Sequence, residues 1–174
     1  MEENRIDEKG FDAIMGIIFD NPRSKIVIDN GASSFLPLAG YLITNQVLEL
    51  LDEHGHAVVF HTIVTGGQDL LDTITGLGEL MTQFPARADF IVWLNEYFVA
   101  IEGEGKTFRE MRVYQEHAAR IKKVITLPRQ SELFAQDMKQ MLEAHLTFDE
   151  AIRSEAFQFM SKHRLQTMRK ALFE

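Results

Sequence analysis

The amino-acid sequence predicts an α/β protein with a mostly parallel sheet and helices on both of its faces. Short apolar runs without polar alternation are typical of strands that are covered on both sides. They alternate with longer segments whose apolar residues recur at helical spacing, an order that indicates βαβ units with right-handed crossovers. The strands are expected at residues 25–29, 57–64, 89–94 and 122–127.

Apolar stripes and capping signals mark the helices between these strands. The first helix is expected to stop at Asn21-Pro22, because proline cannot continue a helix. Thr107 with Glu110, and Thr147 with Glu150, have the spacing of capping boxes. Helices are expected at residues 11–18, 43–50, 70–84, 107–117 and 134–142, in a short segment after Thr147, and at 155–173.

Composition restricts the class of protein. The 174 residues are expected to form one domain, 1–174, and 45% hydrophobic residues suffice for a core. The net charge of −8 repels nucleic-acid phosphates, so no direct nucleic-acid site is expected. The absence of cysteine excludes disulfides and thiolate metal ligands. No apolar run reaches the roughly 18 residues of a membrane span, and a signal-peptide pattern is missing, so we expect a cytoplasmic protein.

The residues that follow the strands are the candidates for chemistry, because parallel sheets bind ligands beyond the carboxyl ends of their strands. Asp29, followed by Asn30-Gly31, fits either a ligand of magnesium-bound water or a simple Asx turn. Thr65-Gly66-Gly67 fits an anion site or, with better support, a tight turn. Asn95-Glu96 and Pro128-Arg129 follow the last two strands.

Residues 100–107 read A-I-E-G-E-G-K-T and match a relaxed phosphate-binding loop with alanine in place of the first glycine. Glu102 and Glu104 would repel phosphate inside such a loop. We therefore favour a solvated acidic loop in which Thr107 caps the next helix, and keep an independent nucleotide site at Lys106 as the alternative. For the three histidines His54, His56 and His61, hydrogen-bonded or surface roles are favoured over a zinc site.

Long strings of residues carry a family resemblance. They include Val27-Ile28-Asp29-Asn30-Gly31-Ala32-Ser33-Ser34-Phe35, His61-Thr62-Ile63-Val64-Thr65-Gly66-Gly67, Val92-Trp93-Leu94-Asn95, Glu104-Gly105-Lys106 and Leu146-Thr147-Phe148-Asp149. Over nearly its whole length the chain resembles the TraL-type proteins of conjugative plasmid transfer regions, which belong to the ParA/MinD-like (SIMIBI) group of P-loop ATPases.

The resemblance implies a P-loop ATPase fold that is incomplete in this chain. Full-length relatives are expected to bind ATP and magnesium through a loop near their N-terminus, and no glycine-rich lysine loop precedes Asp29. The resemblance implies that Asp29 is the metal-site residue, with Asn30 beside it, that Asn95 reads the adenine edge, and that Pro128 lines the base. We therefore expect an N-terminally truncated chain that binds no nucleotide cofactor by itself and does not turn over ATP.

Two functions are consistent with these observations. The first is an accessory protein of plasmid conjugal transfer related to ParA/MinD ATPases. The alternative is a non-enzymatic interaction module of the transfer or partition machinery. In either case the expected partners are other transfer or partition proteins, and a homodimer can form through strand edges that the missing strand leaves open.

Overall fold

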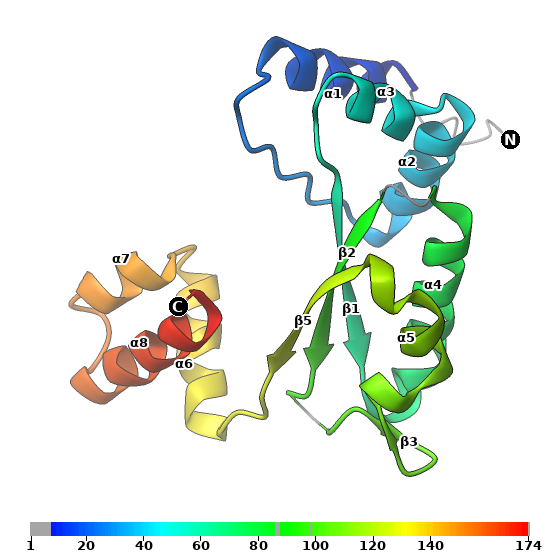
Figure 1. Ribbon diagram of the computed structural model, residues 1–174. Helices are drawn as coiled ribbons and strands as arrows, with labels where there is room; N and C mark the ends of the chain where they lie inside the picture. The colour runs from blue at the N-terminus through cyan, green and yellow to red at the C-terminus, as the bar shows by residue number, and fades with distance from the viewer. Residues whose placement is uncertain (1–7, 86–87, 98, 174) are drawn as a thin grey trace, which may run out of the picture. The chain divides into compact units, whose positions relative to one another are not determined.

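Three strands form a parallel sheet in the order β1-β2-β5 in the computed structural model, which describes residues 8–85, 88–97 and 99–173 (Figure 1). The strands are β1 (Val59–Thr65), β2 (Asp89–Asn95) and β5 (Ile121–Leu127). They confirm three of the four expected strands and the mixed α/β class. The expectation of helices on both faces stays a prediction.

Backbone contacts divide the chain into two compact units. The first contains Met1–Thr62, Ile74–Ile91 and Arg112–Lys123, and the second contains Ile63–Thr73, Val92–Met111 and Val124–Glu174. The amino-terminal halves of the three strands therefore belong to the first unit, and their carboxyl-terminal halves belong to the second. That the whole chain is one domain stays a prediction.

The first unit begins with three helices, α1 (Glu8–Asp20), α2 (Ala32–Thr44) and α3 (Val47–Glu53). The Tyr41 hydroxyl donates to Asp12 Oδ1 at 2.6 Å, and the ring centroids of Phe11 and Tyr41 lie 5.3 Å apart. A long-range polar bond and a ring contact thus join α1 to α2. The helix expected at 11–18 is confirmed, and α1 ends before Asn21-Pro22.

The helix expected at 43–50 is wrong as one continuous element. Gln46 adopts a left-handed backbone conformation, with φ of 51°, which separates α2 from α3. Helix α2 was not predicted, because Gly31-Ala32-Ser33-Ser34 is typical of a loop and Pro37 lies inside the helix. Proline removes one backbone donor there, and the buried Leu38 and Leu42 favour the helix in spite of it.

The strand expected at 25–29 is not formed. The segment belongs to no helix, strand or turn and has no ladder partner among the described residues. Val27 is 90% exposed, and Ile26 and Ile28 are 38% and 42% exposed. An apolar run of this kind predicts a strand. A strand forms only when other strands lie beside it, and the run alone does not determine whether they do.

The sheet has one well-covered face, formed by even-numbered residues of β1 and β2. Phe60 lies between Phe84 and Phe90, with ring centroids 4.5 and 5.5 Å away. Helix α4 (Leu70–Gln83) contributes the buried Leu77 and Met81 to this core. On the other face of β1, Val59 and Ile63 are 43% and 57% exposed, so the expectation of a strand buried on both sides is wrong for β1. An apolar run does not specify which of its two faces another element will cover.

Arg120, just before β5, holds the end of α4. Its guanidinium donates to the backbone carbonyls of Met81, Pro85 (2.8 Å) and Ala88 (3.3 Å). The same group lies 5.1 Å from the centroid of the Phe90 ring. The expected helix at 107–117 is divided into a 3₁₀ turn (Phe108–Glu110) and α5 (Arg112–His117).

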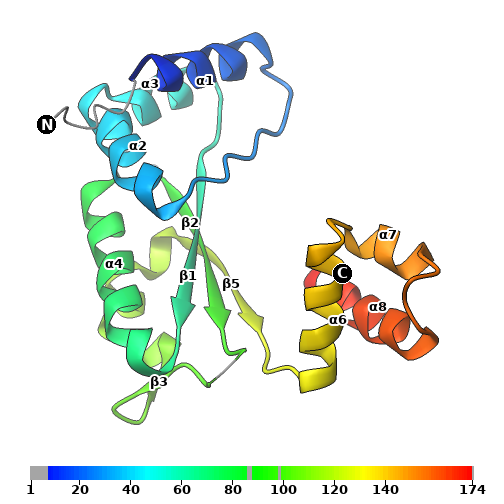
Figure 2. The ribbon, with the colours of Figure 1, turned by 180° about the vertical axis from the view of Figure 1, so that it is seen from behind.

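Three helices form a small core of their own in the second unit: α6 (Glu132–Glu143), α7 (Phe148–Arg153) and α8 (Phe159–Phe173). They lie together in both ribbon views (Figures 1 and 2). The core contains Phe134, Met141, Ala151, Phe157 and Leu165. These helices confirm the three expected from residue 132 onwards, and the capping box of Thr147 and Glu150 is formed as predicted.

Candidate functional site

The carboxyl ends of β2 and β5 are joined by the backbone. The Glu96 N–H donates to the Leu127 carbonyl at 3.0 Å. Asn95 is the last residue of β2, and Pro128 directly follows β5, so the structure brings together two of the residues predicted at the ligand edge. Asn95 is half-buried, whereas Pro128 is exposed.

The Asn95 side chain is oriented by the loop that follows β2. Its Oδ1 accepts from the Tyr97 N–H at 3.2 Å, and Glu96 Oε1 accepts from the Ile101 N–H at 3.4 Å. The Nδ2 donors of Asn95 have no hydrogen-bond partner among the described residues. A half-buried amide with two available donors can bond an acceptor on a planar ligand.

The backbone geometry of the turn after β1 favours glycine at both Gly66 and Gly67. A Cβ added at Gly66 would lie 2.6 Å from the Ala100 carbonyl oxygen, closer than real Cβ contacts, so the two backbones need glycine here. Gly67 has a φ of 75°, which also favours glycine. Thr73 Oγ1 accepts from the Thr65 N–H at 3.3 Å and ties the start of α4 to this turn. The interpretation of Thr65-Gly66-Gly67 as a tight turn accounts for the geometry.

Residues 100–107 contain an antiparallel hairpin of β3 (Glu102–Gly103) and β4 (Lys106–Thr107). Glu104 and Gly105 form its turn with φ of 53° and 73°, and both glutamates are exposed. Thr107 begins the following 3₁₀ turn in a capping box with Glu110, whose pKa is lowered by the hydrogen bonds from Thr107. A hairpin cannot wrap a phosphate as a strand–loop–helix does, which agrees with the solvated acidic loop.

Asp29 and Asn30 lie in the first unit, directly before α2. Asp29 is exposed and Asn30 is half-buried. Gly31 begins the helix, and its carbonyl accepts from the Ser34 and Phe35 N–H groups at 3.0 and 3.1 Å. The structure therefore places these two residues in a segment without regular secondary structure, directly before α2.

The three histidines do not converge. The rings of His54 and His56 contact Phe19 edge-on, with centroids 5.1 and 5.7 Å apart. His61 is exposed on β1. Within residues 8–85, 88–97 and 99–173, no three His, Asp or Glu side chains are grouped so that they could hold a metal ion.

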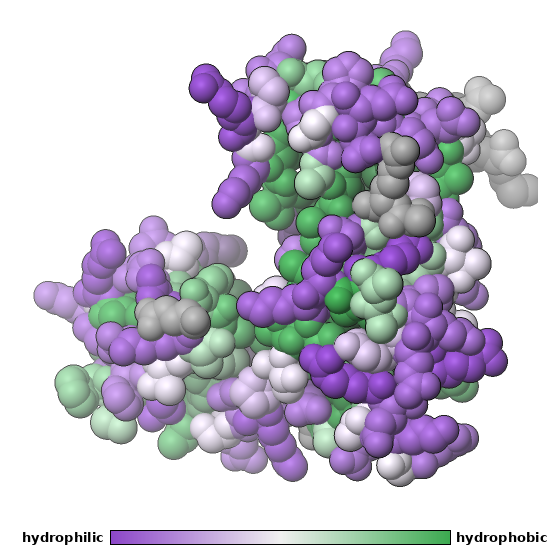
Figure 3. All heavy atoms as spheres, viewed as in Figure 1, coloured by the Kyte–Doolittle hydropathy of each residue, from purple (hydrophilic) through white to green (hydrophobic). Residues whose placement is uncertain are grey.

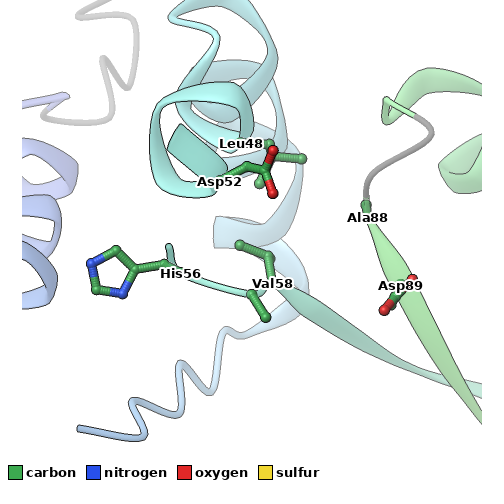
Figure 4. Close-up of a pocket in the computed structure, with 7 residues that line it drawn as sticks. Leu48, Asp52, His56, Val58, Ala88 and Asp89 are labelled. Atoms are coloured by element: carbon green, nitrogen blue, oxygen red, sulfur yellow. The ribbon is translucent and has the colours of Figure 1, made fainter. Parts of the chain in front are cut away.

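A pocket of about 190 Å³ lies at the amino ends of β1 and β2, opposite to the predicted ligand edge. Its lining includes Asp52, His56 and Asp89 (Figure 4). The view shows the His56 ring turned away from both carboxylates. Asp89 forms an ion pair with Lys122 at 3.3 Å. The polar groups therefore do not converge on a ligand, and no local sequence signal indicates the pocket, because its residues come from three separate segments.

A buried ion pair holds the C-terminal helices together. Arg164 on α8 donates from Nε to Asp137 Oδ2 at 2.5 Å and from its terminal nitrogen to Oδ1 at 3.1 Å. Asp137 is 5% exposed, and the Arg164 hydrogen bonds hold the pKa of Asp137 below its usual value against the opposing effect of burial. On the same helix, Arg169 forms an ion pair with Asp149 at 3.0 Å.

No described helix has the length and apolar character that crossing a bilayer requires. No model of a known protein family matches the chain, and no solved structure matches it.

Two proteins from Escherichia coli, each named Protein TraL, are similar to this chain. One is 46% identical over 175 residues, covering 100% of this chain and 72% of the relative. The other is 42% identical over 174 residues, covering 99% of this chain and 72% of the relative. Identity at this level over the whole chain leaves no doubt of common descent, and the chain belongs to the TraL family.

Proposed function

We propose that this chain is an accessory protein of plasmid conjugal transfer, related to ParA/MinD ATPases, whose phosphate-binding loop lies outside its own residues. Membership of the TraL family supports the role in transfer. A location in the cytoplasm, and other transfer proteins as partners, belong to the same proposal. The matched region is 72% of each relative, so the relatives contain further residues, and we place the phosphate-binding loop among them.

The arrangement of Asn95 and Pro128 carries the nucleotide part of the proposal. The bond between Glu96 N–H and the Leu127 carbonyl holds the two positions on neighbouring strands. An asparagine amide can pair with the edge of adenine through its donors and its carbonyl oxygen. The exposed proline ring has no N–H and offers an apolar surface to the flat face of a base. This edge is therefore suited to the adenine end of a nucleotide.

The phosphate end of the nucleotide has no comparable site in this chain. The relaxed loop match at residues 100–107 forms a hairpin, and its two glutamates are exposed there. Phosphate transfer needs a cation and a cradle of amides to neutralise the developing charge. We therefore propose that Asp29, with Asn30, completes a magnesium site only together with a phosphate-binding loop, and that this chain alone does not hydrolyse ATP.

Isothermal titration of the chain with adenosine and with ATP and magnesium tests the proposal. The sequence predicts a chain that binds no nucleotide by itself, but with Asn95 and Pro128 on neighbouring strands we expect weak binding of adenosine. ATP should bind with equal affinity, because the triphosphate adds no contact. Asn95→Ala should weaken adenosine binding about 3- to 10-fold, the effect of losing a hydrogen bond. Asn45→Ala is the control, because Asn45 is an exposed asparagine in the other unit.

Three results would refute this assignment. One is ATP binding at least about 10-fold tighter than adenosine, which would place a phosphate site in this chain. Another is equal adenosine binding by Asn95→Ala and by the Asn45→Ala control. The third is magnesium-dependent phosphate release that Asp29→Ala abolishes. A full-length TraL relative assayed in parallel is expected to bind ATP more tightly than adenosine.

A second candidate function is a non-enzymatic interaction module, and the C-terminal helices favour it. Large apolar side chains are exposed on α6 and α8: Leu133, Leu142, Phe159, Met160 and Phe173, from 54% to 81%. Figure 3 shows apolar surface among hydrophilic residues over this region. Under this function, adenosine and ATP both fail to bind. The DNA upstream of the Met1 codon separates the two, because an in-frame glycine-rich lysine loop supports the first.

A further inference from the structure

The segment between α1 and α2 runs as an open trace in the ribbon, and residues 25–29 belong to no helix, strand or turn (Figure 1). None of their backbone N–H or C=O groups bonds to another described residue. Exposure alternates along the segment, because Val27 is 90% exposed and its neighbours Ile26 and Ile28 only 38% and 42%. Lys25, Val27 and Asp29 therefore share the more exposed side, and the two isoleucines share the other.

An apolar segment with unpaired backbone groups is a template for a further strand. The order of residues along this one indicates which strand fits. The segment reads Lys25-Ile26-Val27-Ile28-Asp29, with a cation at one end, an anion at the other and an apolar centre. When a second copy runs in the opposite direction, its anion therefore lies opposite the cation of the first copy.

We propose that two copies of this chain associate by antiparallel pairing of residues 25–29, centred on Val27. In this register Lys25 of each copy faces Asp29 of the other, Ile26 faces Ile28, and Val27 faces Val27. Opposite charges and apolar pairs across neighbouring strands stabilise a sheet, and like charges directly opposite destabilise it. A parallel pairing in register would place Lys25 opposite Lys25, so the charges select the antiparallel arrangement.

The pairing has the symmetry that dimers usually have. An antiparallel pair of identical strands is related by a two-fold axis, and such an isologous contact closes at two copies. Five residues on each side bury less surface than a standard interface, and two strands alone are marginal in water. The dimer is therefore weak and forms reversibly as the protein concentration rises.

Asp29 is also the residue that we propose for the magnesium site, so the dimer is measured without nucleotide or magnesium, and Lys25 has no part in either nucleotide site. Sedimentation velocity of the full chain over a range of concentrations measures the dimer dissociation constant. Lys25→Asp and Asp29→Lys should each weaken the dimer about 10-fold or more, because each turns two attractive pairs into two repulsive ones. The double variant Lys25→Asp with Asp29→Lys restores opposite charges and should return to within about 3-fold of the native value.

Two controls separate local pairing from general charge repulsion. Arg23→Asp makes the same charge change as Lys25→Asp two residues earlier, at an exposed position outside the paired segment, and should leave the dimer unchanged. Asp29→Lys reduces the net charge of −8, so general repulsion predicts a tighter dimer, whereas the proposed register predicts a weaker one. Circular dichroism confirms that each variant is folded.

Hydrogen exchange gives a second measurement on the native chain. Alternate amides of residues 25–29, those that face the other copy, should become protected as the protein concentration rises. The amides of the exposed hairpin turn at Glu104-Gly105 should not. A chain that stays monomeric at every concentration would overturn the proposal. So would a dimer that weakens equally in Arg23→Asp and Lys25→Asp, or a double variant that fails to recover.

Discussion

Removing the guanidinium of Arg120 is expected to destabilise the first unit strongly. Arg120→Met keeps most of the apolar stem but leaves the carbonyls of Met81, Pro85 and Ala88 without their shared donor. The Met81 carbonyl belongs to the last turn of α4, where carbonyls have no partner within the helix. Arginine therefore completes the hydrogen bonding of the α4 terminus and of the start of β2 at once.

The size of the effect follows from these contacts. Hydrogen bonds to a charged group contribute about 1.5–3 kcal/mol each to the free energy of unfolding, but three bonds to one group are not additive. The contact with the Phe90 ring adds roughly 0.5–1 kcal/mol. Burial lowers the pKa of Arg120, so desolvation of the cation offsets part of this gain. We expect a net loss of about 2–4 kcal/mol, or roughly 5–15 °C in Tm for a chain of this size.

Urea unfolding followed by circular dichroism and by the fluorescence of the single tryptophan, Trp93, measures this loss. Arg112→Met is the matched control, because its side chain is 88% exposed and pairs only with Glu116 on the same helix; it should cost about 0.3–0.5 kcal/mol. Arg120→Lys should be intermediate, since an ammonium cannot reach three carbonyls as a planar fork does. A loss below about 0.5 kcal/mol for Arg120→Met would show that these hydrogen bonds do not stabilise the first unit.

Two further predictions concern the second unit. Asp137→Asn should cost about 1–3 kcal/mol, because it removes the charge that the hydrogen bonds from Arg164 stabilise. The folded-state pKa of Asp137 is lowered. Its stabilisation is therefore complete above the unfolded pKa of about 4 and is lost as pH falls through the folded value. Urea unfolding should therefore show the deficit of the variant to be constant above about pH 5 and to shrink in acid, and a deficit that grows in acid would contradict this assignment. Gly66→Ala should cost about 1–3 kcal/mol, because the new Cβ meets the Ala100 carbonyl. Gly76→Ala, at a helical position with nothing within 4 Å, should stabilise by about 0.5–1 kcal/mol, and equal melting temperatures for the two variants would show that the close approach is absent.

Local patterns in the sequence predicted most of the elements. The strands at β1, β2 and β5, and helices α1, α4 and α6, lie within a few residues of their expected positions. Both capping boxes form as predicted, at Thr107 and at Thr147. These features depend on residues that are only a few positions apart. Their physical causes are the periodicity of apolar residues and the hydrogen bonds from side chains to nearby backbone groups, and both act over this short range.

The sequence pattern was misleading where an element depends on distant neighbours. The run at 25–29 predicts a strand, but a strand needs partners to which it can bond, and the described chain gives it none. Helix α2 was not predicted, because Pro37 and the Gly-Ala-Ser-Ser start disfavour a helix locally. The burial of Leu38 and Leu42, which depends on distant neighbours, favours the helix. Tertiary packing outweighs local propensity in both segments.

The α/β class, the membership of the TraL family and the residues that follow each strand could all be inferred from the amino-acid sequence. Which of those residues meet depends on contacts between distant segments: the bond from the Glu96 N–H to the Leu127 carbonyl holds Asn95 and Pro128 on neighbouring strands, and Gly66 approaches the Ala100 carbonyl. Arg120 and Arg164 likewise bond groups 27 to 39 residues away. No local pattern encodes such pairs, because their contacts arise only after the chain has folded and brought distant segments within bonding distance.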